Sequence, residues 1–370
     1  MKWREKLKKE NICTIDELKK HILLSKKEEK LMKKAADIHP MSITKYYFSL
    51  INRKDKNDPT RKLIVPSQDE LDLHGVYDTS GEQQSTKSVG LQHKYAETAL
   101  LLSTNRCAAY CRFCFRKRLV GLSDEEILKR LDEAINYIKE HEEINNVLIS
   151  GGDPLTLPTK VIEKFLRKLS AIDHLDFIRF GSRVPVVFPD RIIEDKELLS
   201  LFKKYSTKKR RIYVVSHFNH PNEITEKSMK GIDKLIKSNV IVNNQTVLLK
   251  GVNDNPDVLA ELMNKLVSTG VNPYYVFQCR PIKRVVHHFQ VPFYFGCRVI
   301  ENARKKLNGH AKRFKYAMSH KRGKLEILGI KGKYIFFKQH QARDSELIGQ
   351  IFKRKIDKTS GWLNDSLKLN

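Results

Sequence analysis

Cys107-Ala108-Ala109-Tyr110-Cys111-Arg112-Phe113-Cys114 places three thiols in one short stretch, with the spacing C-x3-C-x2-C. A four-iron cluster normally takes four thiolates, and no fourth cysteine lies near these three. The spacing therefore predicts a 4Fe-4S cluster with one iron open to the amino and carboxylate groups of a small molecule. A zinc knuckle is one alternative, although zinc takes four ligands, usually as two pairs, and no second pair exists. Three unrelated core thiols are another.

Short apolar runs around this loop alternate with helical stretches. Strands are expected over residues 99–103, 146–149, 177–180, 212–215, 240–247 and 274–277, and a helix over about 123–140. This alternation of strands and helices predicts an α/β fold with a parallel sheet, open or closed into a partial (β/α)6 TIM-like barrel. The cysteines, Gly151-Gly152, Gly181-Ser182-Arg183 and His217 follow strands, where such a barrel has its catalytic side.

The segments before and after the barrel have patterns of their own. Residues 1–35 are expected to form one or two amphipathic helices, with Leu18, Ile22 and Leu23 as a helical stripe. A turn-rich lead-in follows over residues 38–73. The expected division is 1–92 for the helical and lead-in segment, 93–308 for the partial barrel, and 309–370 for a basic carboxy-terminal segment.

Composition limits the class of protein. The 370 residues are 40% hydrophobic, enough for one large enzyme domain with terminal elements. No apolar run approaches the roughly 18–20 residues of a membrane span, so no membrane partner is expected. Three of the six cysteines share one motif, which does not suit a disulfide framework and indicates a reducing, cytoplasmic setting.

Positive charge dominates the chain, with a formal net charge of +27. Residues 309–370 hold 15 Lys or Arg against 5 Asp or Glu. Such a segment could face nucleic acid or an acidic protein. We favour a solvated lysine-rich surface, because basic and acidic residues are interspersed elsewhere, and we expect no nucleic-acid partner.

Further motifs accompany the cysteines. Gly151-Gly152-Asp153-Pro154 alone would be an ordinary βα turn. Here, however, the turn comes one βα unit after a cysteine triplet that has an aromatic residue, Phe113, before its last cysteine. In that position the turn resembles the element of radical S-adenosylmethionine (radical SAM) enzymes that receives the methionine amino group of SAM. Six motifs narrow the resemblance to the lysine 2,3-aminomutase family, from about Ile43 to about Gly329: 90–95, 114–118, 181–185, 217–223, 244–254 and 273–279.

The resemblance implies roles for individual residues. It implies a 4Fe-4S cluster on Cys107, Cys111 and Cys114, and SAM contacts from Gly151, Gly152, Asp153, His217 and Gln245. It also implies that Arg116 pairs with the substrate carboxylate and that Lys324 holds pyridoxal 5′-phosphate (PLP). Taken alone, Arg116 could be surface charge, His217 a structural histidine like His220, and Lys324 a chance lysine.

Four positions depart from the family pattern. Arg280 stands where lysine-acting enzymes have an aspartate for the distal ammonium, and a second aspartate has no counterpart near Met318 and Ser319. Thr98 replaces an arginine on the cofactor side, and the glycine run is shortened to Arg322-Gly323-Lys324. The first two departures predict a substrate other than lysine, with an acidic or neutral polar side chain. The alternative is an Arg280 that faces solvent or pairs with an acid of the chain.

The leading prediction is a radical SAM isomerase that uses the cluster, SAM and PLP to move an amino group between adjacent carbons of an amino acid. Its implied partners are a small amino acid substrate and a reductase, flavodoxin or ferredoxin as electron donor, and a homo-oligomer stays open. An alternative is a radical SAM enzyme that has lost aminomutase chemistry and modifies a protein or RNA. A nucleic-acid-binding protein with a structural cluster is a third class, against which the order of the motifs argues.

Overall fold

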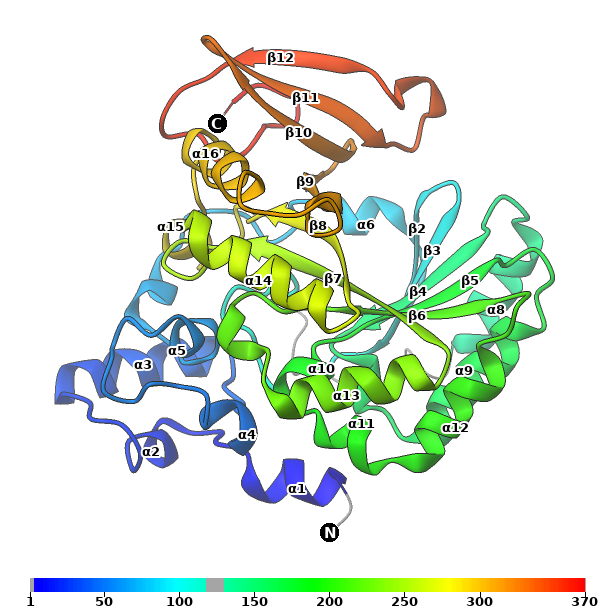
Figure 1. Cartoon of the computed structure of the whole chain (residues 1–370), viewed down its shortest axis with the longest axis horizontal. Helices are drawn as coiled ribbons and strands as arrows, with labels where there is room; N and C mark the ends of the chain where they lie inside the picture. Colours follow the sequence, from blue (N-terminus) through cyan, green and yellow to red (C-terminus); the bar gives the residue numbers. More distant parts are fainter. Residues whose placement is uncertain (1–2, 118–129, 370) are drawn as a thin grey trace.

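A curved sheet of twelve strands, whose spatial order follows the chain, forms the centre of the molecule (Figure 1). The computed structural model describes residues 3–117 and 130–369. Seven neighbouring strands run parallel: β3 (Thr98–Thr104), β4 (Asn146–Gly151), β5 (Phe177–Gly181), β6 (Arg211–Ser216), β7 (Val240–Leu248), β8 (Asn272–Gln278) and β9 (Lys315–His320).

All six predicted strands are present as β3 to β8, and the predicted α/β partial barrel is confirmed. Strand β7 shows why its sequence suits this sheet. Val240, Val242 and Leu248 are buried, while every second residue between them, including Gln245, is half-buried. Because neighbouring side chains on a strand point to opposite faces, one face of β7 packs into the core and the other lines the inner side of the curve.

Antiparallel strands extend the sheet at both ends: β1 (Thr86–Ser88) and β2 (Leu91–Tyr95) before β3, and β10 (Gly323–Lys331), β11 (Tyr334–Gln341) and β12 (Ile351–Lys355) after β9. In β10 and β11, buried Leu325, Ile327, Ile335 and Phe337 alternate with more exposed residues. The basic carboxy-terminal segment therefore continues the sheet, and its apolar side belongs to the core.

The two ends of the parallel region approach each other through side chains. Lys94 Nζ, from β2, donates to the backbone oxygen of His320 (2.6 Å), and Gln341 Nε2 donates to Glu97 Oε1 (2.6 Å). These two bonds bring the end of β9 and the end of β11 next to β2 and to the turn between β2 and β3. Residues from both ends of the parallel region therefore help to line the inner face.

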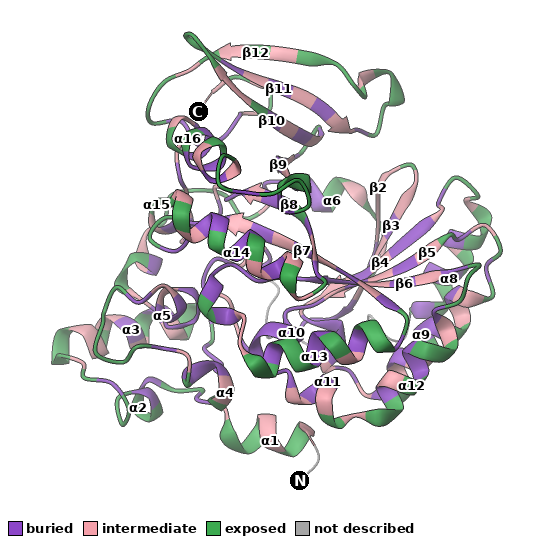
Figure 2. Cartoon of the chain, in the orientation of Figure 1, coloured by how far each residue is buried: buried purple, intermediate pink, exposed green. Residues whose placement is uncertain are grey.

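Six amphipathic helices pack along the sheet: α8 (Leu131–Glu140), α9 (Thr159–Ser170), α12 (Lys196–Tyr205), α13 (Glu226–Lys237), α14 (Pro256–Ser268) and α16 (Phe293–Arg304). Their apolar sides are buried and their polar sides exposed (Figure 2). Four shorter helices lie in the connections: α6 (Glu82–Ser85), α10 (Val184–Val187), α11 (Asp190–Glu194) and α15 (Val286–Phe289). Of the predicted helix over about 123–140, residues 123–129 lie outside the described residues, and α8 forms the end of it.

The amino-terminal region holds α1 (Trp3–Glu10), α2 (Ile15–Leu18), α3 (Lys26–Ile38), α4 (Lys45–Phe48), α5 (Pro59–Ile64) and the 3-10 helix η1 (Gln68–Leu71). The predicted stripe is right for Leu18 and Ile22, which are buried, and wrong for Leu23, which is 92% exposed. The reason is a chain turn before Ser25, whose hydroxyl accepts from the Glu28 backbone N–H (3.2 Å) and starts α3. None of the described helices is long and apolar enough to cross a membrane.

Candidate active site on the inner face of the sheet

The three cysteines of the motif lie on the loop that follows β3. All three are half-buried and free of disulfides. Backbone bonds fix the loop, because the Tyr110 N–H donates to Ser42 O (3.0 Å) and the Arg112 N–H donates to Leu63 O (3.0 Å). Both acceptors belong to the lead-in, so that segment supports the cysteine loop directly.

A buried ion cluster holds the same loop. Glu70 accepts bonds from Arg112 (2.8 and 2.7 Å) and from Lys117 (2.6 Å), and the three side chains are almost inaccessible to solvent. Burial alone would raise the pKa of Glu70, but Arg112 and Lys117 together lower it to about 2. The carboxylate therefore stays ionised and links the lead-in to the residues that flank the last two cysteines.

The three cysteines offer three thiol donors on one loop, which suits a 4Fe-4S cluster with one open iron. Burial raises the pKa of Cys114 to about 11 and that of Cys107 well above its ordinary value. These thiols are therefore protonated until a metal takes the place of the proton.

Arg183, which follows β5, reaches Cys111. Its Nη1 donates to Cys111 Sγ (2.9 Å), and its Nη2 donates to Glu223 Oε1 (2.7 Å) and the Tyr47 hydroxyl (3.1 Å). Burial disfavours the charge of this guanidinium, but Cys111, Tyr47 and Glu223 together raise its pKa. A fixed positive charge thus lies against one cysteine. Sequence reasoning singled out Arg183 only as part of a motif and gave it no role.

Gly151 and Gly152 allow a close backbone approach. A Cβ on Gly152 would lie 2.2 Å from Arg106 O, and one on Gly151, whose φ is +119°, would lie 2.3 Å from Thr104 O. The Gly152 N–H donates to Thr104 O (2.5 Å), and the Asp153 N–H donates to Arg106 O (2.8 Å). The turn after β4 therefore fixes the residues immediately before Cys107.

The Asp153 carboxylate joins two loops of the site. It accepts the Ser182 hydroxyl (2.7 Å) and the backbone N–H groups of Leu155 (3.0 Å), Arg183 (2.7 Å) and Val184 (3.0 Å). Burial raises the pKa of Asp153, and these bonds oppose the rise. The carboxylate is fully engaged by the protein, so its contribution to a ligand would come through positioning the turn.

His217 and Gln245, predicted to contact SAM, lie at β6 and β7. The Nε2 atom of His217 is buried without a hydrogen-bond partner, and its ring meets Phe113 edge-on at 5.5 Å. Burial, aided by Arg183, lowers the pKa of His217 to about 3, so the ring is neutral. His220 differs, since its Nδ1 accepts the Asn222 N–H (3.2 Å). The unpaired Nε2 is a polar atom available to a ligand.

Lys324, on β10, lies among aromatic side chains. Its ammonium is 4.4 Å from the ring centroid of Tyr275, 5.8 Å from that of Phe277 and 5.9 Å from that of Tyr95. Among the described residues it has no hydrogen bond or ion pair. Burial, followed by repulsion from Arg179, lowers the pKa of Lys324 to about 7. A substantial fraction of this amine is therefore neutral near pH 7, as a nucleophilic lysine requires.

Arg116 and Arg280, the two arginines predicted to face substrate, lie together. Their guanidinium carbons are 4.6 and 4.2 Å from the ring centroid of Phe115. Arg116 Nε donates to Glu82 Oε1 (3.1 Å), and Arg280 Nη1 donates to the Ser80 hydroxyl (2.9 Å). Burial lowers the pKa of Arg280 and Glu82 opposes the shift. Arg280 is therefore half-buried, bonded to Ser80 and adjacent to Arg116.

Sequence reasoning missed Arg179, on β5. Its Nη2 donates to Asn146 Oδ1 (2.5 Å), while its buried Nε has no hydrogen-bond partner. Asn146 Nδ2 in turn donates to Thr98 Oγ1 (3.1 Å). Arg179 thus lies near Thr98, which replaces the arginine expected on the cofactor side. The only sequence signal was a charged residue inside the apolar run Phe177-Ile178-Arg179-Phe180.

Positive charge exceeds negative charge on this inner face. Five cationic side chains and three acids are linked in pairs by the effect of one charge on the pKa of another: Lys94, Arg116, Arg179, Arg280 and Lys324, with Asp78, Glu82 and Glu97. Burial lowers the pKa of Lys94 to about 7 as well. Such a surface is complementary to ligands that carry phosphate or carboxylate groups.

Comparison with known proteins gives concordant matches. Residues 101–263 match the model of the radical SAM superfamily. L-lysine 2,3-aminomutase of Clostridium subterminale is 40% identical over 311 residues, which cover 83% of this chain and 73% of that protein. Glutamate 2,3-aminomutase of Clostridioides difficile is 37% identical over 302 residues, covering 81% of this chain and 70% of that protein.

The other matches include a third relative and a solved structure. L-lysine 2,3-aminomutase of Acetoanaerobium sticklandii is 41% identical over 304 residues, covering 81% of this chain and 71% of that protein. A radical SAM methyltransferase structure from Sphaerobacter thermophilus is 15% identical with a TM-score of 0.41, covering 61% of this chain and 68% of that one, a likeness too small to add support. The superfamily implies a 4Fe-4S cluster and SAM as cofactors. The chain belongs to the lysine 2,3-aminomutase family of radical SAM isomerases.

Proposed function

We propose that this protein is a 2,3-aminomutase for an amino acid with an acidic side chain, and that it uses PLP held by Lys324. Cys107, Cys111 and Cys114 would hold the cluster. SAM would lie on the open iron, near the turn at 151–153, His217 and Gln245. The inner face of the sheet would then place SAM, PLP and substrate together.

The SAM assignment is supported by the unpaired Nε2 of His217. That atom is buried close to Phe113 of the cysteine motif and has no partner in the described chain. Gln245 lies on the inner side of β7 and is half-buried. Leaving a buried polar atom unpaired costs about 1–3 kcal/mol, which a ligand hydrogen bond would offset.

The PLP assignment is supported by Lys324 and Arg179. Lys324 offers an amine that has a pKa of about 7 and lies among three aromatic rings. Arg179 offers an unpaired buried N–H group, which could donate to the phosphate and so replace the arginine missing at Thr98. Bound PLP would supply an electron sink for the migrating amino group.

The acidic substrate is supported above all by Arg280. It lies against Phe115 beside Arg116, so the two arginines could each take one carboxylate of a dicarboxylic amino acid. A lysine substrate would bring its distal ammonium toward Arg280 and would be repelled. Relatives of nearly equal identity are named for lysine and for glutamate, so overall identity does not decide the substrate.

A binding experiment tests the proposal. Arg280→Gln should weaken binding of L-glutamate to the cluster-loaded, PLP-loaded protein about ten- to a hundredfold, because a charge-assisted bond contributes about 1.5–3 kcal/mol. Arg298→Gln, which changes an exposed arginine on α16, is the matched control and should bind glutamate as the unaltered protein does. Titration calorimetry gives the dissociation constant of glutamate for each variant. Lysine binding as tightly as glutamate or aspartate would contradict the proposal.

A further inference from the structure

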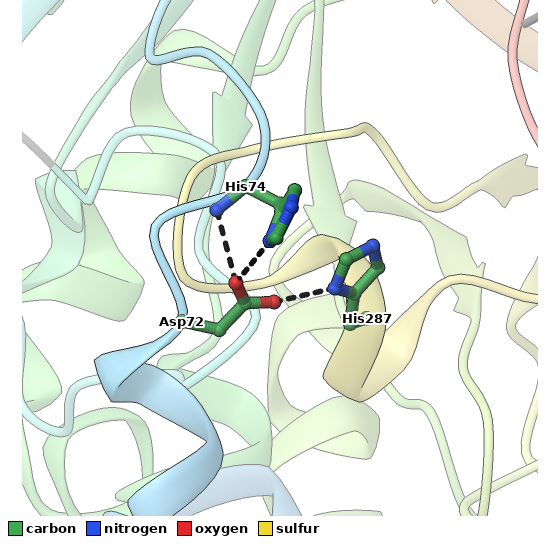
Figure 3. A group of neighbouring side chains, drawn as sticks. All are labelled: Asp72, His74 and His287. Atoms are coloured by element: carbon green, nitrogen blue, oxygen red, sulfur yellow. Dashed lines mark hydrogen bonds and ion pairs between the residues drawn. The ribbon is translucent and has the colours of Figure 1, made fainter.

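We propose that Asp72, His74 and His287 form a site for a divalent transition metal of the zinc type, which ties the lead-in to the loop after β8. Figure 3 shows the three side chains pointing toward one another from two segments distant in the chain. Asp72 and His74 follow η1, and His287 belongs to α15. The site shares no ligand with the cysteine motif.

The donor atoms are close enough for one ion. Asp72 Oδ1 lies 2.6 Å from His74 Nδ1, Asp72 Oδ2 lies 2.6 Å from His287 Nδ1, and the ligand atoms all lie within 4.8 Å of one another. Tetrahedral zinc with bonds of about 2.1 Å keeps its ligands about 3.4 Å apart. Small rotations would suffice to open that space. Both imidazoles are free to make them, because the His74 and His287 side chains are 73% and 62% exposed.

The chemistry of the donors selects the kind of metal. Two imidazole nitrogens and one carboxylate favour zinc and its transition-metal neighbours over magnesium or calcium, which prefer oxygen ligands alone. A neutral imidazole can carry its proton on Nε2 and present the Nδ1 lone pair. Solvent can supply the fourth ligand.

The surrounding backbone suggests what the ion would do. The Val76 N–H donates to Pro281 O (3.0 Å), and the Lys283 N–H donates to Val76 O (3.2 Å). Gly75 makes this contact possible, because a Cβ there would lie 2.5 Å from Pro281 O. The first segment leads to Ser80 and the second begins at Arg280, which bond each other. A bound ion would therefore cross-link the two segments that position Arg280.

Metal analysis of the cluster-loaded protein tests the site. The double variant His74→Ala/His287→Ala is compared with His21→Ala/His310→Ala, in which two exposed histidines elsewhere are removed. After dialysis against buffered zinc, the unaltered and control proteins should each hold about one zinc per chain, with unchanged iron. The double variant should bind zinc more than about 100-fold more weakly, since losing even an outer-shell partner costs roughly 10- to 100-fold.

Hydrogen–deuterium exchange tests the cross-link itself. Zinc should slow exchange in peptides covering residues 68–78 and 281–289 of the unaltered and control proteins, and not in the double variant. Equal zinc content in all three proteins, or no zinc in the unaltered protein, would overturn the site. Zinc bound through His74 and His287 without slower exchange in these peptides would overturn the cross-link.

Discussion

The cysteine loop and the Lys324 region lie on the same inner face, but the chain builds them in opposite ways. Around the cysteines, backbone groups and buried side chains of both charges are bonded to one another, as in Asp153 with its four donors and Glu70 with Arg112 and Lys117. Around Lys324, long cationic side chains converge, and the Lys324 amine and Arg179 Nε have no hydrogen-bond or ion-pair partner among the described residues. In the first region the carboxylates of Glu70 and Asp153 are bonded within the protein, and the unpaired atoms include His217 Nε2 and Arg183 Nε. The second region has cationic donors left over for anionic ligands.

This difference agrees with the expectations drawn from the family resemblance. The cysteine motif and the turn at Gly151-Gly152 are expected to keep the family pattern, and Thr98 and Arg280 are expected to depart from it. A region held by backbone packing tolerates little change, because each substitution meets a fixed neighbour. A region lined by long side chains can change its ligand by exchanging one of them.

The largest effect is expected from removing one cysteine of the motif. Cys111→Ala should abolish cluster binding and reductive cleavage of SAM together, because two thiolates hold four irons poorly. Iron per chain and methionine release measure this. Cys13→Ser, which changes an exposed cysteine outside the motif, should keep both. Iron-replete, SAM-cleaving Cys111→Ala protein would contradict the assignment.

The next largest effect is expected from removing the Lys324 amine, which should impair the Lys324 region and leave the cysteine region intact. Lys324→Ala should lower isomerase activity more than about 10³-fold, as removal of a nucleophile commonly does, yet keep the cluster and slow SAM cleavage. Mass spectrometry after borohydride reduction should find a pyridoxyl group on Lys324 of the unaltered protein and none in the variant. Lys321→Ala, which removes an exposed lysine paired with Asp365, is the matched control.

The pKa of Lys324 adds a pH test to the same prediction. Only the neutral amine reacts with an aldehyde, and its pKa is lowered to about 7. The rate of PLP incorporation into PLP-free protein should therefore rise with pH up to about 7 and level off above it. A rate that keeps rising tenfold per pH unit beyond pH 9 would show a lysine with an ordinary pKa.

The smallest effect is expected from adding a side chain to the close backbone contact at Gly152, and it concerns the free energy of unfolding. Gly152→Ala should lower the free energy of unfolding by about 1–3 kcal/mol, because its Cβ would lie 2.2 Å from Arg106 O and force the backbone to shift. Gly309→Ala, with nothing within 4 Å of the new Cβ, should change stability little. Thermal unfolding of the cluster-loaded proteins measures both. Equal melting temperatures would mean that the turn adapts freely.

The sequence predicted much of this molecule because some of its signals are local. The cysteine spacing and six apolar runs identified the motif and β3 to β8. Strand β9 was not predicted, because its apolar run is only the three residues Tyr316-Ala317-Met318 between polar neighbours. The alternation in β10 and β11 was obscured by their charge. Arg179 was missed because its position on the inner face depends on strand register. The pairing of Asp72 with His287 depends on the fold as a whole.

The most direct test of the central claim is hydrogen transfer from SAM to the substrate. The protein is loaded with cluster, PLP and SAM deuterated at the 5′ carbon, reduced, and offered a panel of amino acids that includes glutamate, aspartate and lysine. Mass spectrometry should find deuterium in glutamate or aspartate, and this label should vanish in Lys324→Ala protein. Deuterium entering lysine as readily as the acidic amino acids, or entering no amino acid of the panel, would contradict an acid-specific aminomutase.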